Sequence, residues 1–204
     1  MLRFVKQQTI LFMGPQGSGK GTQVELLKSY LAKNDPSQTI IHFEMGKSLR
    51  KLSEANSYAG DLVKKILDEG GLVPQAVSAS LFTTHLMENL KTGDEHIIID
   101  GFPRTVSQIP MLNSAILDFY KRSSPIVLWI GVSDAEAVKR LLLRARPDDT
   151  EENIRKRLEW SAAETKPALL WFKANPPYKV FDIKGEQSVE DVQKDILAVL
   201  ENAR

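Results

Sequence analysis

A glycine-rich stretch near the N-terminus holds the residues whose types and spacing best suit phosphate chemistry. Residues 14–22 read GPQGSGKGT and follow the apolar run 9–13. Closely spaced glycines allow successive backbone N–H groups to converge on phosphate oxygens at a helix N-terminus, and Lys20 adds a positive charge. The next residue is Gly21, so the hydroxyl that usually contacts Mg²⁺ comes one position late, at Thr22. This pattern predicts a loop that binds a nucleoside triphosphate.

A second group of polar residues follows another apolar run, 97–99. Asp100 ends this run, and an acid in such a place beside a phosphate-binding loop can hold Mg²⁺ through water molecules. Arg104 has a fork of N–H donors that suits bidentate contact with a phosphate. The Gln108 amide can both donate to and accept from the edge of a base. These residues predict further phosphate and base contacts near the loop.

The elements that must position these residues alternate along the chain. Short apolar runs rich in β-branched residues are separated by longer segments with helical periodicity, as in Val24, Leu27 and Leu31. This spacing predicts an α/β fold in which helices flank a parallel sheet, with the phosphate chemistry at the carboxyl ends of the strands. We expect five strands, at 9–13, 39–43, 96–99, 125–132 and 179–183. Capping boxes predict helices that begin at Ser133 and Ser188.

Length and composition limit the classes of protein to which the chain can belong. A chain of 204 residues suits one domain with a sizeable core, 1–204. With 27 Lys and Arg against 26 Asp and Glu, the net charge is +1, and no global field attracts nucleic acid or an anionic membrane. There is no cysteine for a disulfide framework or a Cys-based zinc site. The N-terminal residues lack the apolar core of a signal peptide, so we expect a cytoplasmic protein.

Together these motifs resemble those of the adenylate kinase family, which are P-loop nucleoside monophosphate kinases. The loop ending Gly-Lys-Gly-Thr-Gln is more specific than a general phosphate-binding loop, and Asp100 opens the family's second signature, Asp-Gly-Phe-Pro-Arg-Thr. The resemblance implies a three-layer P-loop fold and transfer of the γ-phosphoryl group of ATP to AMP, giving two ADP. It covers nearly the whole chain, because further residues fall in the family's order: Gly46, Arg50, Gly70, Leu72, Val73, Pro74, Arg140, Arg144, Asp148, Asp149, Arg157 and Leu158.

The resemblance also implies roles for the matching residues. A monophosphate already carries ionised oxygens, so catalysis needs positioning and charge neutralisation and no general base. Asp100 would order the hydrated Mg²⁺. The implied catalytic residues are Lys20, Arg104, Arg144, Arg146 and Arg157. The implied ATP-binding residues are Gly17, Ser18, Gly19, Lys20, Gly21, Thr22, Arg140 and Lys184. The implied AMP-binding residues are Met45, Gly46, Arg50, Leu67, Val73, Gly101, Arg104 and Gln108.

Two departures from the family lie on the acceptor side. The family usually reads Ser-Thr-Gly-Asp before its arginine, whereas Glu44, Met45, Gly46 and Lys47 precede Arg50 in this chain. Met45 cannot hydrogen-bond a base as threonine does, so we expect loose selectivity for AMP. Lys47 replaces an acid, and we expect it to contact a phosphate directly.

The largest departure is a deletion between Arg144 and Asp148. The family inserts a lid over ATP at this place, whereas only Ala145, Arg146 and Pro147 lie between these residues. We therefore expect 144–148 to be a vestigial lid connection. Closure would then depend on a helical monophosphate-binding insertion, 45–74. Without a lid to exclude water, we expect weaker ATP binding and some ATP hydrolysis.

Two other functions remain open at this stage. The first is a UMP, CMP or GMP kinase, which would share the phosphate-binding residues. The second is a catalytically weak nucleotide-binding regulatory protein, although such a protein would not need the cations around the transferred group. The expected partners are the substrates ATP and AMP, with neither nucleic acid nor membrane. We expect a monomer, although an oligomer could cover the open site.

Overall fold

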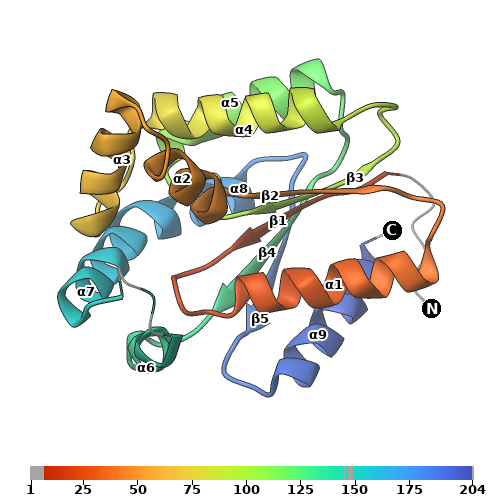
Figure 1. Ribbon diagram of the computed structural model, residues 1–204. Coiled ribbons are helices and arrows are strands. Elements are labelled where there is room, and N and C mark those ends of the chain that lie inside the picture. Colours follow the sequence, from red (N-terminus) through yellow and green to blue (C-terminus); the bar gives the residue numbers. More distant parts are fainter. Residues whose placement is uncertain (1–6, 145, 147–148, 204) are drawn as a thin grey trace.

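The computed structural model describes residues 7–144, 146 and 149–203. Five parallel strands form a single sheet in the order β2-β3-β1-β4-β5 (Figure 1). The strands are β1 (Thr9–Met13), β2 (Ile40–Glu44), β3 (His96–Asp100), β4 (Ile126–Gly131) and β5 (Lys179–Lys184). The prediction of five parallel strands is thus confirmed, with ends that differ from the apolar runs by a residue or so.

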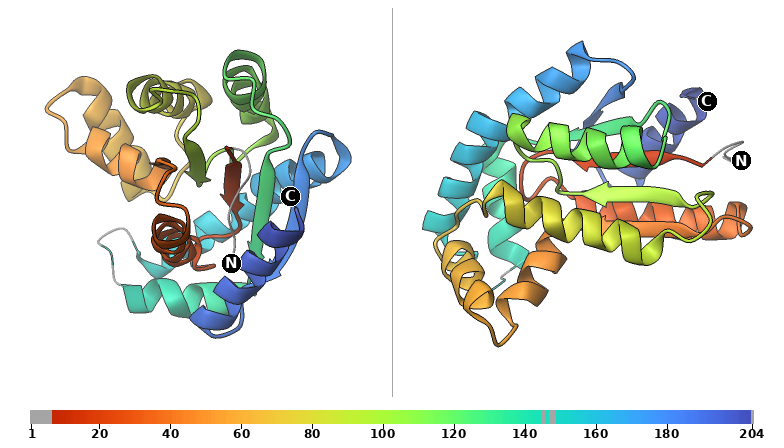
Figure 2. Two further views of the ribbon diagram at one scale, coloured as in Figure 1. Left: turned by 90° about the vertical axis from the view of Figure 1, so that its right-hand side faces the viewer. Right: turned by 90° about the horizontal axis from the view of Figure 1, so that it is seen from above.

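The helices cover both faces of this sheet, which makes the expected three-layer α/β fold (Figure 2). The helices that flank the sheet or follow its carboxyl end are α1 (Lys20–Asn34), α2 (Met45–Ser53), α3 (Tyr58–Asp68), α4 (Gln75–Asn89), α6 (Asp134–Arg144), α7 (Glu151–Trp160), α8 (Lys166–Ala174) and α9 (Val189–Asn202). Shorter segments are η1 (Val106–Gln108), α5 (Ile109–Asn113), η2 (Ser114–Phe119) and η3 (Ser161–Thr165). Both predicted capping serines accept the expected backbone hydrogen bond, from Glu136 N at 3.4 Å and Asp191 N at 3.1 Å.

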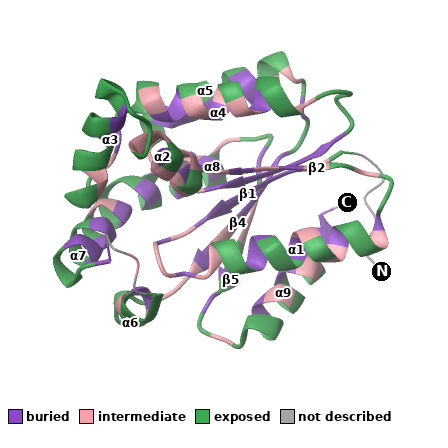
Figure 3. Cartoon of the chain, viewed as in Figure 1, coloured by how far each residue is buried: buried purple, intermediate pink, exposed green. Residues whose placement is uncertain are grey.

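Alternate residues of the strands divide the core into two layers (Figure 3). On one face, Ile10 and Phe12 of β1 pack with the buried stripe of α1 and with α9. On the other face, Leu11 and Met13 pack with α4, α5 and α8. Side chains of a strand point alternately to opposite faces, so a strand that is covered on both sides reads as a continuous apolar run. This explains why all five residues of β1 are buried.

The carboxyl ends of the strands bring the polar residues to one edge of the sheet. Parallel register places Phe12 of β1 opposite Asp100 of β3, and Asp100 opposite Glu44 of β2. The phosphate-binding loop leaves β1 at this edge and leads directly into α1. Helices α2 and α3 follow β2 at the same edge and pack on each other, and both lie within residues 45–74.

No helix in the described part of the chain combines the length and the apolar character needed to cross a membrane.

Candidate active site

The loop between β1 and α1 wraps around the Lys20 ammonium group. Lys20 Nζ donates to the carbonyl oxygens of Gly14 at 2.9 Å and Pro15 at 2.7 Å, and to Ser18 Oγ at 3.2 Å. Burial lowers the pKa of Lys20 to about 8, although the Asp100 carboxylate acts in the opposite direction. The loop thus holds a cation at the start of α1, where helix N–H groups also favour an anion.

Two glycines of the loop cannot be replaced without a clash. A Cβ atom on Gly14 would lie 2.3 Å from the Ile130 carbonyl oxygen, and one on Gly17 would lie 2.7 Å from the Ala137 carbonyl oxygen. Both glycines also have positive φ angles, 141° and 81°. The loop therefore packs directly on β4 and α6, which fixes its curvature.

Asp100 ends β3 beside the loop and is only 8% exposed. Burial raises the pKa of its carboxyl group, and Glu44 adds to this effect, whereas Lys20 opposes it. The described residues contain no cluster of three or more metal-ligating side chains. Asp100 and Glu44 are the two carboxylates that line the cavity at this edge.

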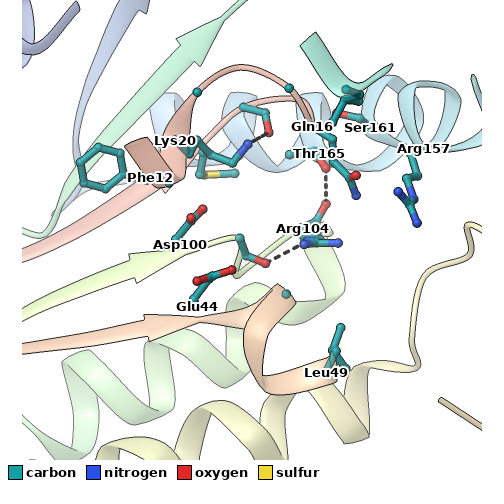
Figure 4. A pocket seen from close by; sticks show the side chains of 18 of the residues that line it. Phe12, Gln16, Lys20, Glu44, Leu49, Asp100, Arg104, Arg157, Ser161 and Thr165 are labelled. Atoms are coloured by element: carbon teal, nitrogen blue, oxygen red, sulfur yellow. Dashed lines mark hydrogen bonds between the residues drawn. The ribbon is translucent and has the colours of Figure 1, made fainter. Parts of the chain in front are cut away.

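Arg104 is held in the centre of the site by several contacts (Figure 4). Its Nε atom donates to the Gly101 carbonyl oxygen at 2.9 Å, and its guanidinium group lies 5.3 Å from the centre of the Trp160 ring. The backbone of Arg104 is fixed as well, because its N–H donates to Gln108 Oε1 at 2.7 Å and its carbonyl accepts from Thr165 Oγ1 at 3.0 Å. These contacts align a rigid cation for an anionic ligand.

The acceptor side is formed by the end of β2 and by α2. Arg50 of α2 donates from Nη2 to Glu44 Oε1 at 3.0 Å. A small second cavity is lined by apolar and polar residues that include Met45, Val73 and Gln108. Met45 is 2% exposed and its thioether offers little to a polar base edge. This second cavity brings together Met45, Val73 and Gln108, three of the residues that the resemblance assigns to AMP binding.

Asp149 lies between α6 and α7 and pairs with one arginine of each helix. Its carboxylate accepts from Arg144 Nε at 2.8 Å, from Arg144 Nη2 at 2.7 Å and from Arg157 Nη1 at 3.1 Å. Burial disfavours the Asp149 carboxylate, but its contacts with Arg144 and Arg157 outweigh this effect and lower its pKa. One fully buried carboxylate side chain thus orients two arginines toward the cavity.

Helix α7 also holds the C-terminal end of α3. Three side chains of α7 donate to backbone carbonyls there: Arg157 Nη2 to Leu67 at 3.5 Å, Asn153 Nδ2 to Asp68 at 2.8 Å and Trp160 Nε1 to Gly70 at 3.1 Å. Gly70 follows the end of α3 with a φ angle of 71°, and a Cβ atom on it would lie 3.2 Å from the Asn153 backbone. The helical insertion is therefore tied to the helix that carries Arg157.

A cavity of about 520 Å³ unites these groups. Of the site residues predicted from the sequence, fifteen line it: Gly17, Gly19, Lys20, Gly21, Thr22, Gly46, Arg50, Leu67, Asp100, Gly101, Arg104, Arg140, Arg144, Arg146 and Arg157. Met45, Val73 and Gln108 line the second cavity, together with Leu67, Gly101 and Arg104.

Some predicted residues lie away from the cavity. Ser18 is buried and contacts Lys20 from behind the loop. Lys184 at the end of β5 and Lys47 on α2 are exposed and line neither cavity. Of the connection at 144–148, Ala145, Pro147 and Asp148 lie outside the described residues.

The structure adds residues to which sequence reasoning gave no role. Glu44 and Trp160 line the cavity, as does Thr165, which fixes the backbone of Arg104. Asp149 matched the family's order, but its bridge between two arginines was not predicted. Only Glu44 had a signal in the sequence: like Asp100, it is an acid at the end of a β-strand.

Comparison with known proteins points to one family. The family model "Adenylate kinase" matches residues 12–176. An adenylate kinase of Prochlorococcus marinus (strain MIT 9301) is 37% identical over 187 residues, which is 92% of this chain and 95% of the relative. An adenylate kinase of Maricaulis maris (strain MCS10) is 36% identical over 198 residues, or 94% of this chain and 98% of the relative. With its five-stranded parallel sheet and phosphate-binding loop, the chain belongs to the adenylate kinase family of nucleoside monophosphate kinases.

Proposed function

We propose that the cavity binds ATP and AMP end to end and transfers the γ-phosphoryl group of ATP to AMP, giving two ADP. The observation that carries this proposal is a single cavity with a phosphate-binding loop on one side and Arg50 and Arg104 on the other. Lys20 and the loop would bind the phosphates of ATP, and Arg50 and Arg104 would bind the phosphate of AMP. Family membership supports the same reaction.

Catalysis in this proposal consists of positioning and charge neutralisation. The acceptor phosphate is already ionised, so the chain needs no general base. Arg144, Arg146 and Arg157 line the cavity together with Lys20 and Arg104, and their charges would stabilise the negative charge on the transferred group. Arg140 donates to the Gly185 carbonyl at 3.1 Å and would flank the adenine of ATP.

Mg²⁺ is the proposed cofactor. Asp100 would hold the ion through water, because its carboxylate lies beside the loop and the described residues offer no larger cluster of metal-ligating side chains. When bound with ATP, Mg²⁺ would neutralise phosphate charge. The residues of the chain would supply the remaining contacts: Lys20 orients the phosphates and Asp100 fixes the ion.

We further propose that the enzyme works without a lid. Residues 145–150 alone connect α6 to α7. Arg144 and Asp149 at the two ends of this connection are joined by hydrogen bonds of 2.7 and 2.8 Å. Closure would then fall to the helical insertion, 45–74, and water would reach the transferred group more easily than in a covered site. We expect weaker ATP binding, slow ATP hydrolysis without acceptor, and activity as a monomer.

The test is a nucleotide assay with ATP, Mg²⁺ and one acceptor at a time: AMP, UMP, CMP or GMP. ADP formation that depends on AMP supports the proposal, and a rate with AMP above those with the other acceptors supports AMP as the substrate. A higher rate with a pyrimidine or guanine monophosphate would assign a different acceptor, read by a second cavity in which Met45 offers no threonine-like contact. ATP binding with no transfer to any acceptor would make the protein a nucleotide-binding regulator.

A further inference from the structure

Glu44 brings a negative charge to the part of the cavity that must accept an anion. It is the last residue of β2, it pairs in register with Asp100, and both residues line the cavity. Glu44 Oε1 accepts a hydrogen bond from Arg50 Nη2 at 3.0 Å. The side chains of Glu44 and Arg50 are 31% and 38% exposed, so a ligand can reach both. The Glu44 carboxylate thus makes with Arg50 the kind of contact that the proposed function assigns to the phosphate of AMP.

Three other arginines of the cavity, Arg104, Arg144 and Arg157, are held differently. Arg144 and Arg157 share Asp149, whose side chain is fully buried behind them and lies outside the cavity lining. Arg104 donates its Nε to a neutral carbonyl oxygen, that of Gly101. An incoming phosphate can join these arginines without displacing a charged partner that faces the cavity. At Arg50 an incoming phosphate meets such a partner, because Glu44 lines the cavity and already accepts from Nη2, and carboxylate and phosphate compete for the same guanidinium group.

The position of Glu44 also suits a role in the empty enzyme. Figure 4 shows the carboxylates of Glu44 and Asp100 close together where the two strands end. Arg50 repels both Arg104 and Arg146, while Glu44 attracts Arg146. Without a bound anion, a cluster of guanidinium groups is unfavourable, and a nearby carboxylate reduces the repulsion.

We propose that Glu44 sets the affinity for the acceptor: it holds Arg50 in the empty enzyme as a stand-in for the monophosphate, and it releases Arg50 when the monophosphate binds. This inference rests on the proposed function, because it takes Arg50 as a ligand of the acceptor phosphate. The exchange of one anion for another weakens monophosphate binding. It leaves ATP binding unchanged, since Lys20 is held by the loop's own oxygens and not by Glu44.

The experiment measures the Kd for AMP alone by titration calorimetry, in buffer with a metal chelator. In Glu44→Gln the charge is lost while the size is kept, and we expect AMP to bind about three- to fivefold more tightly, the range of a partly exposed ion pair. The matched control is Glu54→Gln, which removes an acid from the end of α2 that is exposed and outside the cavity. The control should bind AMP as the wild type does.

A second background shows whether Glu44 acts through Arg50. In Arg50→Met the stand-in has no partner, so adding Glu44→Gln should change the Kd for AMP by much less than in the wild type. If Glu44→Gln does not fold, as judged by circular dichroism, Glu44→Ala replaces it in both backgrounds.

Three results would overturn the inference. The first is unchanged or weaker AMP binding in Glu44→Gln, and the second is an equal gain in AMP affinity when Glu44→Gln is added to Arg50→Met. The third is a raised Mg²⁺ requirement of Glu44→Gln with ATP, which would make Glu44 a metal-holding residue. Failure of the proposed function looks different. AMP that binds without being converted to ADP overturns the proposed reaction alone, whereas an unchanged Kd in Glu44→Gln with normal ADP formation overturns only the role of Glu44.

Discussion

Replacement of Asp149 by asparagine should uncouple two arginines on either side of the short connection between α6 and α7, Arg144 and Arg157. The side chains of Asp149 and Arg157 are 0% and 5% exposed, and breaking a buried pair costs about 3–5 kcal/mol. Arg144 is 33% exposed, so its two hydrogen bonds contribute on the scale of surface pairs, roughly 0.2–1 kcal/mol. Asparagine keeps the shape and one acceptor, which places the expected loss near the lower end, at about 3 kcal/mol in the free energy of unfolding.

The assay is urea unfolding at pH 7, with Glu151→Gln as the control. Glu151 bonds Arg155 at 2.7 Å, a similar distance, but the two side chains are 61% and 67% exposed. The control should lose less than about 0.5 kcal/mol, as expected for an exposed pair on one helix. We also expect kcat to fall by up to about 10²-fold in Asp149→Asn, because Arg144 and Arg157 lose their alignment. Equal, small losses in both variants would show that the buried Asp149 carboxylate does not stabilise the fold through Arg157.

The same pair predicts a pH dependence. The pKa of Asp149 is lowered in the folded state, so its contribution to stability is present above the unfolded pKa of about 4 and is lost as the pH falls through the lower, folded value. The difference in unfolding free energy between wild type and Asp149→Asn should therefore be constant near neutral pH and shrink below about pH 4. A difference that stays the same at low pH would show that the carboxylate charge is not the cause.

The remaining predictions concern the phosphate-binding loop and the hold of α7 on α3. Burial lowers the pKa of Lys20 to about 8, and bound phosphates favour its charged form. Above that pH, ATP binding should therefore take up a proton, and the Kd for ATP should rise about tenfold per pH unit. Calorimetry in two buffers measures the proton uptake, and no uptake would contradict the prediction. Gly17→Ala should destabilise the fold by about 1–3 kcal/mol more than Gly93→Ala. Both glycines have positive φ angles, but only the Cβ atom added at residue 17 would clash with a carbonyl oxygen, at 2.7 Å. Equal losses of stability in urea unfolding would count against the clash. Asn153→Ala removes the hydrogen bond to the Asp68 carbonyl oxygen. Hydrogen exchange in residues 67–71 should become faster, with a loss of about 1 kcal/mol in the free energy of local opening. Unchanged exchange there would show that Asn153 does not hold α3.

The sequence predicted those features that depend on local pattern. The strand runs are buried on both faces and so read as continuous apolar segments, and the loop glycines and Lys20 lie close together in the chain. Contacts between distant segments could not be read in this way. Trp160 with Gly70, and Thr165 with Arg104, are brought together only by the packing of α7 and η3 on the other elements.

The acceptor side shows the same limit. Met45 was read as the loss of a base contact; its side chain is buried and lines the second cavity, and the loose selectivity expected from it stays a prediction. Lys47 was expected to contact phosphate, yet its side chain is exposed and outside the cavity lining, because the position of a residue within α2 decides which face it occupies. Glu44, at the strand end, carries the charge that reaches Arg50.

The central claim is that one cavity joins a triphosphate site to a monophosphate site for direct transfer. The most direct measurement is the product balance after incubation with ATP, AMP and Mg²⁺, with nucleotides and inorganic phosphate quantified separately. Direct transfer gives two ADP for each AMP consumed, with only a slow release of inorganic phosphate. ADP and inorganic phosphate appearing at the same rate with and without AMP would contradict it, because ATP would then be hydrolysed and AMP would not be the acceptor.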